Sequence, residues 1–225
     1  MLSCYNTPIQ TNSKGENVMK KLLCGLIAGV CAFSTVNALA DNEIKLPTPN
    51  LQDNVSLKTA LEKRKTARVF SNKSLSELDL SNLLWAAYGA NRPNGKRTIP
   101  AARGIYAIEM YAALSDGVYK HNPGDNALVK VSSKDMRGAS DGRKMGAKAP
   151  VVLIMVADKT VFNGNAPQYI AMEAGAIMQN IYLYCAAYNF NTVACGSFNP
   201  QEWAKELKLP ADKYVILTQV VGCPR

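Results

Sequence analysis

The feature that most constrains the fold is an apolar stretch in the last third of the chain, residues 167–188, PQYIAMEAGAIMQNIYLYCAAY. As a helix it would make about six turns, with apolar side chains pointing in almost every direction around the axis. A helix that is apolar on every side is buried on every side. The chain must therefore enclose this helix in the middle of the fold or pair it with another subunit. Asn189 or Asn191 is expected to end it in a left-handed turn.

The other segments predict a mixture of helices and strands. Ser56 and Ser76 are expected helix caps, because their hydroxyl groups can accept hydrogen bonds from the first free backbone amides. The remaining expected elements are helices over 57–64, 77–88 and 199–209, buried strands over 150–158 and 213–222, a strand running into a loop over 192–198, and a hairpin over 104–122 that turns at Asp116-Gly117. Residues 135–150 are rich in glycine and lysine and are typical of a mobile loop. The sequence predicts an α+β fold with a central, mostly antiparallel sheet flanked by helices.

The first 40 residues resemble a leader more than folded protein. From Met19 the chain reads MKKLLCGLIAGVCAFSTVNALADN, which has a basic start, an apolar run and small residues up to Ala40. This pattern predicts a secretory signal peptide at about 19–40, with 1–18 as an upstream extension, and an exported product that is periplasmic or secreted. The alternative is an uncleaved anchor, but a stable membrane span needs about 20 apolar residues. We expect residues 41–55 to form an extended N-terminal arm and residues 56–225 to form a single domain.

Residues that carry common catalytic chemistry are sparse. The single histidine, His121, falls in the expected hairpin and is expected to be an exposed loop residue, which argues against a histidine-rich metal site and a Ser/His/Asp triad. No glycine-rich nucleotide-binding pattern and no cluster of carboxylates is present. Behind the leader remain Cys185, Cys195 and Cys223, whose odd number and wide spacing imply no disulfide framework. One Cys195–Cys223 bridge is the alternative.

Positive charge is concentrated in one part of the chain. Residues 58–103 contain ten lysines and arginines and three acidic residues, whereas the rest of the chain from Asp41 onward has 13 of each sign. The density is greatest at Lys63, Arg64, Lys65 and Arg68. Because such a cluster repels itself, it indicates an anionic partner. Nucleic acid is the less favoured partner, because the segment lacks interleaved aromatic residues for base stacking.

Several segments resemble the nitroreductase-like FMN family, closest to its short, azoline-dehydrogenase-like branch. They are LEKRKTARVF, RTIPAARGIYAIEMYAAL, GAIMQNIYLYCAAYNFNTVACGSFN and LKLPADKYVILTQVVGCP, and the resemblance covers nearly all of residues 56–225. It implies a compact α+β homodimer, with FMN and the long helix at the subunit interface. It also implies an enzyme that passes a hydride or two electrons through flavin N5 to a small organic acceptor. The family usually draws these electrons from NAD(P)H.

The phosphate-binding element of this family matches Arg64, Lys65, Thr66 and Arg68. The resemblance implies that Arg64 forms a charge-assisted pair with the FMN phosphate and that the Thr66 hydroxyl donates a hydrogen bond to it. Arg68 is placed near the ribityl chain and the pyrimidine edge, where a fixed cation raises the reduction potential of the flavin. The alternative for Arg64 is a cation favoured at a helix C-terminus.

The RTIPAAR stretch matches a family loop that usually reaches the flavin from the second subunit. Pro100 stiffens this loop, and the small Ala101 and Ala102 allow close approach. Alanine at position 101 replaces the usual serine, so one hydroxyl contact with the flavin is missing. The alternative is a solvated basic loop.

The ACGSF stretch matches the loop over the reactive edge of the flavin. Gly196 lets the main chain approach N5, and Cys195, which replaces an acidic residue of some relatives, is expected to be an inert, half-buried thiol. Arg225 is implied as a further phosphate ligand, with a frayed chain end as the alternative. No side chain is expected to be an obligate catalytic acid or base. The alternative function is an exported, non-catalytic module that binds a phosphorylated or anionic ligand.

Overall fold

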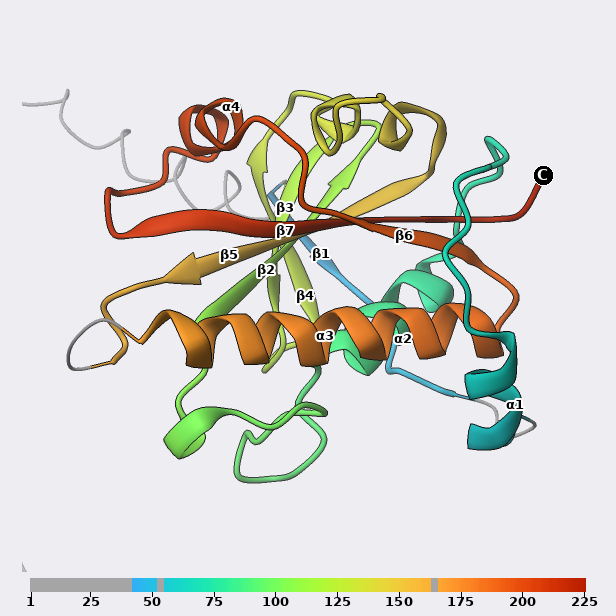
Figure 1. Cartoon of the computed structure of the whole chain (residues 1–225), viewed down its shortest axis with the longest axis horizontal. Helices are drawn as coiled ribbons and strands as arrows, with labels where there is room; N and C mark the ends of the chain where they lie inside the picture. Colours follow the sequence, from blue (N-terminus) through green and yellow to red (C-terminus); the bar gives the residue numbers. More distant parts are fainter. Residues whose placement is uncertain (1–41, 52–54, 163–165) are drawn as a thin grey trace, which may run out of the picture. The chain divides into compact units, whose positions relative to one another are not determined.

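A computed structural model of the chain describes residues 42–51, 55–162 and 166–225 (Figure 1). The expected upstream extension and signal peptide lie outside these residues. The strands are β1 (Glu43–Lys45), β2 (Ile108–Leu114), β3 (Gly117–Asn122), β4 (Ala127–Ser132), β5 (Val151–Asp158), β6 (Asn191–Cys195) and β7 (Lys213–Gly222). The helices are α1 (Leu57–Lys63), α2 (Glu77–Tyr88), α3 (Pro167–Ala187) and α4 (Pro200–Glu206), with short 3-10 helices η2 (Ala102–Gly104), η3 (Arg137–Ala139) and η4 (Gly146–Lys148).

The described strands form one seven-stranded sheet in the order β1-β4-β3-β2-β5-β7-β6. Every neighbouring pair in it is antiparallel, which confirms the expected fold class. The strands expected over 150–158 and 213–222 are β5 and β7, which pair with each other in the sheet. Residues 151–157 of β5 are all buried. The expected N-terminal arm contributes β1, which lies at one edge and pairs with β4.

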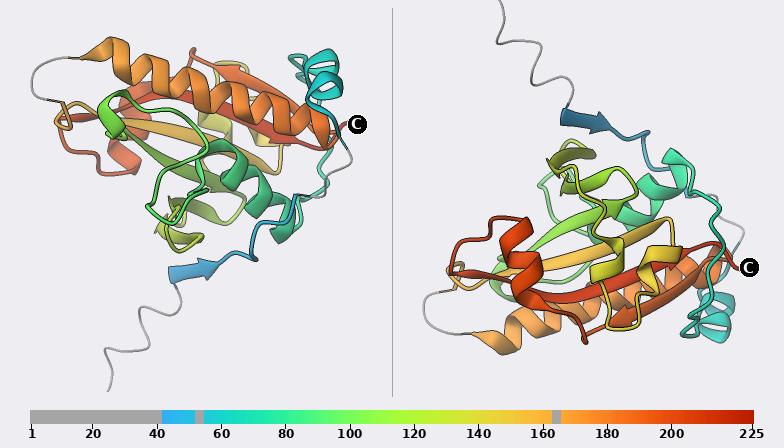
Figure 2. Two further views of the ribbon diagram at one scale, coloured as in Figure 1. Left: turned by 90° about the horizontal axis from the view of Figure 1, so that it is seen from below. Right: turned by 90° about the horizontal axis from the view of Figure 1, so that it is seen from above.

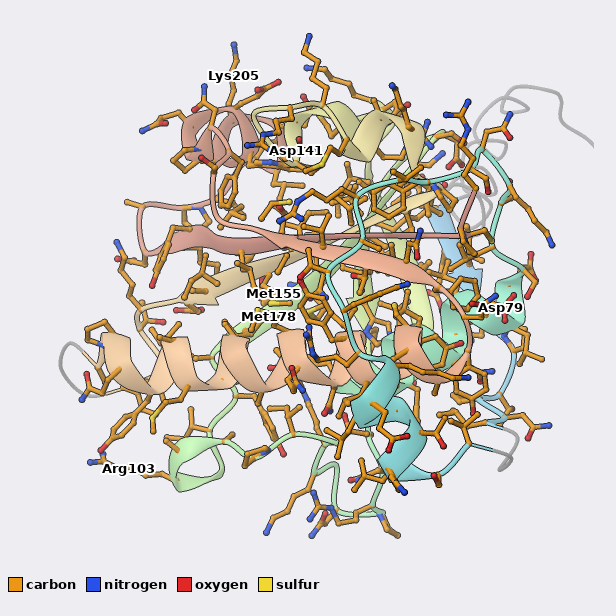
Figure 3. The ribbon with its side chains drawn as sticks, turned by 45° about the vertical axis from the view of Figure 1, so that its right-hand side comes forward. Asp79, Arg103, Asp141, Met155, Met178 and Lys205 are labelled. Carbon is orange, nitrogen blue, oxygen red and sulfur yellow. The ribbon has the colours of Figure 1, made fainter. Side chains whose placement is uncertain are left out.

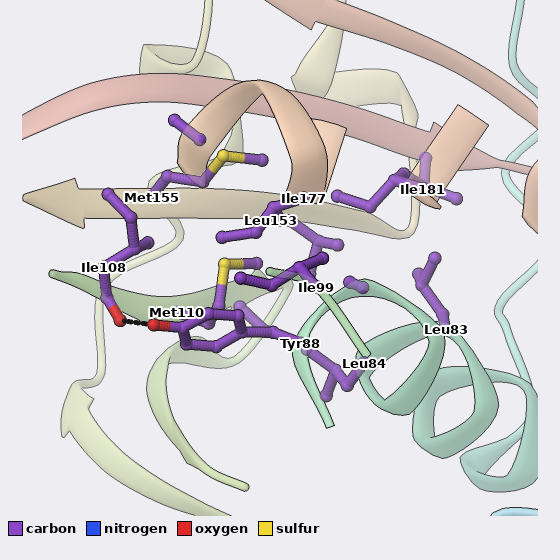
Figure 4. Close-up of a cluster of buried hydrophobic side chains, with 14 of the residues drawn as sticks. Leu83, Leu84, Tyr88, Ile99, Ile108, Met110, Leu153, Met155, Ile177 and Ile181 are labelled. Carbon is purple, nitrogen blue, oxygen red and sulfur yellow. Dashed lines mark hydrogen bonds between the residues drawn. The ribbon is translucent and has the colours of Figure 1, made fainter. Parts of the chain in front are cut away.

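Helices cover both faces of the sheet, so the fold has three layers (Figure 2). On one face, α2 and α3 bury Leu83, Leu84, Ile177 and Ile181 against residues of β2 and β5, as the close-up in Figure 4 shows. On the other face, Trp203 of α4 is fully buried among side chains that alternate along β5 with those of the first face. Two cores on one sheet explain why β5 is apolar at every position from 151 to 157.

The long apolar helix is α3, and one of its faces packs on the sheet. Its residues 170, 173, 174, 177, 181, 182, 184 and 185 are buried. Its other face carries Met172, which is 71% exposed in the single chain, and half-buried residues such as Leu183. The chain therefore encloses only half of this helix. The helix ends before Asn189, whose φ of 59° is the expected left-handed turn.

The expected helix caps are confirmed. The Ser56 hydroxyl accepts a hydrogen bond from Thr59 N at 3.1 Å, and the Ser76 hydroxyl accepts one from Asp79 N at 3.0 Å. Each serine thus provides an acceptor for a backbone amide that has no partner inside its helix. Helix α2 ends at Tyr88, as expected.

The expected hairpin is β2–β3, but two details of the prediction are wrong. Leu114 pairs with Gly117, so Ser115 and Asp116 form the turn. His121 is not an exposed loop residue: it lies in β3 and is 4% exposed. The strand continues through position 121, and the alternation of side chains turns Tyr119 and His121 toward the α2–α3 face.

Candidate functional site

Helix α1 and the segment after it bring the basic cluster to the edge of the sheet. The helix ends at Lys63, and the ψ of 119° at the following residue, Arg64, turns the chain out of the helix. The following residues run beside β6, where Ala67 N donates to Thr192 O at 3.0 Å. Arg64, Lys65 and Arg68 therefore follow one another along the outer side of an edge strand.

Tyr182 of α3 is the common contact of this segment. The Arg64 guanidinium lies over the Tyr182 ring, 5.3 Å from its centre. The hydroxyl groups of Thr66 and Tyr182 are 3.1 Å apart, and Tyr182 Oη also accepts a hydrogen bond from Ala194 N at 3.1 Å. One tyrosine thus links the basic segment to the strand that leads to Gly196.

The cations of this cluster have no acidic partner within the described residues. The ion pairs of that part of the chain include none with Arg64, Lys65 or Arg68. Arg64 and Lys65 line a cavity of about 480 Å³ together with Tyr182 and Pro224, and Glu62, which pairs with Lys58, also lines it. Arg225, the exposed residue after Pro224, therefore ends the chain next to the cluster. This arrangement is suited to a dianion such as a phosphate.

The end of β6 brings two further expected residues to this region. Cys195 is 7% exposed, and burial raises the pKa of its thiol to about 11, with the negative charge of Asp141 adding to the shift and Arg68 opposing it. The thiol is therefore protonated near neutral pH, as expected for an inert cysteine. Gly196 is exposed, and a Cβ atom placed on it would meet nothing within 4 Å. The space above this peptide is open to a ligand.

Residues 135–150 are also part of this region, which the sequence interpretation as a mobile loop missed. The buried Asp141 carboxylate accepts hydrogen bonds from Arg143 N at 2.8 Å, Met145 N at 3.0 Å and Gly146 N at 3.0 Å. Gly142 N donates to Ser197 O at 2.9 Å, which fixes the loop against the residue after Gly196. Figure 3 shows Asp141 on the α4 side of the sheet. An aspartate in a glycine-rich turn was the available signal, since such carboxylates often bind nearby backbone amides.

The loop with Pro100, Ala101 and Ala102 does not join the basic cluster in this chain. It lies on the far side of α3 from β6 and β7 in Figure 1, at the opposite end of the helix from α1. At its start, the Arg97 guanidinium lies 3.9 Å from the centre of the Tyr88 ring and 4.4 Å from that of Tyr106. Arg97 is therefore held inside its own chain, away from Arg64 and Lys65.

Cys185, Cys195 and Cys223 are free, and the register of the sheet explains why a Cys195–Cys223 bridge is wrong. Cys195 is opposite Thr218, whereas Asn191 is opposite Gly222, next to Cys223. Cys223 is five residues along the chain from Thr218, or roughly 16 Å. A disulfide needs Cα atoms within about 7 Å.

Other kinds of site find no support in the part of the chain that the structure describes. Within it, no group of three or more His, Cys, Asp or Glu side chains is placed to hold a metal ion. No described helix has both the length and the apolar character needed to cross a bilayer.

Comparison with known proteins identifies the family. The model of the nitroreductase family matches residues 61–223. A Methanocaldococcus jannaschii protein named as a nitroreductase is 30% identical over 193 residues, which are 80% of this chain and 96% of that protein. A crystal structure from Ralstonia eutropha, also named as a nitroreductase, is 31% identical with a TM-score of 0.77, and the match covers 88% of this chain and 97% of that one.

A more distant similarity concerns the fold alone. A chain of the microcin synthetase complex of E. coli is 18% identical, with a TM-score of 0.60 over 88% of this chain and 84% of that one. The family match and the two similarities of 30% or more lead to one conclusion: the chain belongs to the nitroreductase family, which is a family of oxidoreductases.

Proposed function

We propose that the protein is an FMN-dependent oxidoreductase that passes a hydride or two electrons to a small organic acceptor. The observation that carries this proposal is a set of three cations with no acidic partner among the described residues, Arg64, Lys65 and Arg68, of which Arg68 lies near Cys195 and the open backbone at Gly196. The donors present fit FMN, because a phosphate dianion would offset the charge of the cluster and Thr66 offers a hydroxyl group next to it. The family membership of the chain supports the same cofactor.

In this proposal FMN supplies the redox chemistry, and the chain supplies binding and orientation. Arg64 and Lys65 bind the phosphate, and Arg225 adds a third cation from the chain end. Arg68 lies near the thiol of Cys195 and therefore near the Gly196 peptide, where its charge favours an anionic form of the ring. The absence of a side chain at Gly196 allows the main chain to contact the ring edge.

A homodimer completes the proposed site. The exposed face of α3 and the exposed Leu57 and Leu61 of α1 offer an apolar surface to a second copy. A second copy would also bring its own Pro100, Ala101 and Ala102 toward the flavin. We further propose export, as the leader-like segment suggests. NAD(P)H is the family's usual electron donor, and an exported enzyme would need a different one.

The test is FMN binding and reduction by the purified full chain. We expect the protein to take up FMN and to pass electrons from a chemical reductant to a nitroaromatic acceptor. Arg64→Gln and Arg68→Gln should each weaken FMN binding by roughly 10- to 100-fold, since each removes a charge-assisted contact. Lys58→Gln is the matched control, because Lys58 is on the exposed face of α1 and pairs with Glu62 at 3.8 Å.

Two outcomes would count against the proposal. A wild-type protein that does not bind FMN rules it out. A protein that binds FMN or another phosphorylated ligand without any electron transfer supports the non-catalytic binding module instead.

A further inference from the structure

The sheet divides between β2 and β3 at one end. The two strands pair with each other only from Tyr111 opposite Lys120 to Leu114 opposite Gly117. Beyond that point β2 stays paired with β5 as far as Ile108, and β3 stays paired with β4 as far as Asn122. Residues 108–110 and 121–122 therefore belong to one sheet without pairing with each other.

Buried side chains hold β2 apart from β3 at this division. The Tyr88 hydroxyl lies 2.5 Å from Ile108 O, as drawn in Figure 4, and 2.7 Å from Glu173 Oε1. Ile108 N donates to Glu173 Oε1 at 3.2 Å, and Ala107 N donates to Glu173 Oε2 at 2.9 Å. Tyr88 and Glu173 thus occupy the backbone groups of Ile108 that would otherwise pair with β3. The division is built into the fold and is not a frayed end.

A cavity of about 400 Å³ fills the gap, and we call it the β2–β3 slot. Its walls are mostly apolar and include Ile108, Met110, Val129 and Val131. Glu109 and Lys120 also line it, but they pair with each other at 2.8 Å. This combination of apolar walls and a few polar groups is typical of small-molecule sites.

Two polar side chains in the slot have buried nitrogen atoms that make no hydrogen bond of ordinary geometry with a described residue. His121 is 4% exposed, and neither of its ring nitrogens makes a hydrogen bond of ordinary geometry. Arg97 Nη1 is likewise buried without a partner. The Arg97 guanidinium is held between the rings of Tyr88 and Tyr106, and it forms no ion pair with a described carboxylate. Buried groups of this kind are costly to leave unpaired, so a ligand that pairs with them would be favoured here.

We propose that the β2–β3 slot binds a small carboxylate with an apolar body. The carboxylate accepts hydrogen bonds from Arg97 Nη1 and from the His121 ring, because a guanidinium matches the geometry and charge of a carboxylate. The apolar body contacts Met110 and Val131. The slot is formed by α2, β2, β3, β4 and the loop that carries Arg97, whereas the proposed FMN donors are on α1, α3 and β6 and in the segment after α1. Only the loop after α2 is common to both proposals, so a failure to bind FMN would leave the slot proposal standing.

The charged groups around His121 give this binding a dependence on pH. Arg97 approaches the ring from the loop after α2, and its positive charge adds to burial in lowering the pKa of His121, while the Asn126 amide from the β3–β4 turn opposes them. Tyr88 of α2 and the Glu109–Lys120 pair line the same slot, and Glu173 of α3 lies behind Tyr88. A bound carboxylate offsets the charge of Arg97 and favours protonated His121. Binding should therefore take up a proton and become stronger as the pH falls.

The test uses the fact that His121 is the only histidine in the sequence. Its ring resonances in an NMR spectrum of the full chain, purified without a histidine tag, report on the slot directly and require no enzymatic activity. We expect benzoate to shift these resonances and to raise the pH at which His121 titrates. Benzamide, which has the same shape without the charge, should bind at least about tenfold more weakly, since it loses the charge-assisted bonds.

Three variants make the result specific. Arg97→Gln should abolish the benzoate effect, and Arg103→Gln should leave it unchanged, because Arg103 is an exposed residue of the same loop (Figure 3). Val131→Trp, at a position that is 40% exposed, should block the slot without removing a charge. If Arg97→Gln does not fold, loss of the benzoate-induced shift of His121 in Val131→Trp is the test of the proposal. The proposal is overturned if benzoate leaves the wild-type His121 signals unmoved, which would mean that the slot holds only water. It is also overturned if benzamide acts as strongly as benzoate, or if Val131→Trp responds like the wild type.

Discussion

The side chains of Thr66 and Tyr182 form a hydrogen bond of 3.1 Å between their hydroxyl groups, although 116 positions separate them in the sequence. Tyr182 Oη already accepts a hydrogen bond from Ala194 N, so its own proton is free to point at Thr66. In that arrangement Thr66 accepts from Tyr182 and keeps its own proton for an outside acceptor. Tyr182 thus orients the hydroxyl group that faces the proposed phosphate.

Tyr182→Phe should weaken FMN binding while the fold is retained. The change removes the bond that orients Thr66, which corresponds to roughly a 2- to 10-fold rise in the dissociation constant. Quenching of FMN fluorescence on binding measures this constant. Tyr169→Phe, on the same helix but away from the basic cluster, is the control. An unchanged affinity in Tyr182→Phe would show that Thr66 needs no orientation.

Two glycines should respond in opposite ways to substitution. Gly196→Val should leave the melting temperature unchanged, because its new side chain enters open space, but it should weaken FMN binding at the place where the ring approaches. Gly146→Ala should lower the melting temperature, because its Cβ atom would collide with Ser140 Oγ and the Arg137 carbonyl. Thermal unfolding and FMN titration of both variants separate these effects. Normal FMN affinity in Gly196→Val would remove this glycine from the proposed site.

His121 should make the protein less stable in acid. Burial lowers the pKa of His121 to about 4, with the positive charge of Arg97 as the second cause, whereas an unfolded chain leaves it near the usual 6.5. The unfolded state therefore binds this proton first, and stability is lost as the pH falls from about 6.5 toward 4. Between pH 7 and pH 5 this group should cost about 2 kcal/mol of unfolding free energy.

Urea unfolding of the wild type and of His121→Gln at both pH values measures this effect. The variant should lose less stability than the wild type over the same interval, since other groups titrate alike in both proteins. Equal losses in the two proteins would contradict the prediction.

The exposed apolar residues of α1 and α3 should matter for assembly. Leu61 is 52% exposed and Met172 is 71% exposed, and both belong to the surface proposed to face a second copy. Leu61→Glu and Met172→Glu should therefore each shift the protein from dimer to monomer in sizing chromatography and reduce FMN retention. Val129→Glu, at a position that is 38% exposed on β4, is the control and should leave the dimer intact. A wild-type protein that elutes as a monomer would contradict the dimer itself.

Local chemistry explains which parts of the structure could be predicted from the sequence. The serine caps, the apolar central strands and the cluster of Arg64, Lys65 and Arg68 depend on residues close together in the chain, where spacing alone is informative. The position of His121 depended on how far β3 continues past its turn, which a sequence pattern defines poorly. Asp141 was missed because its partners are backbone amides, so only its place in a glycine-rich turn pointed to them.

The long helix shows a second limit of sequence interpretation. Its apolar residues correctly predicted burial, but the pattern alone did not say which side faces the sheet and which side remains available to another subunit. That distinction depends on the packing of residues such as Ile177 against β5, which is a tertiary contact.

The segment from Arg64 to Ser71 has a second role that follows from its position along β6. Ala67 N donates to Thr192 O, and the side-chain Nδ2 of Asn191 donates to Val69 O, so this segment covers the outer edge of β6. An exposed edge strand has unpaired backbone N–H and C=O groups that can pair with another protein chain and cause aggregation. The same segment carries the cations of the proposed phosphate site. A phosphate bound there would therefore also hold this segment against β6. Solubility and flavin occupancy of this protein should therefore rise and fall together.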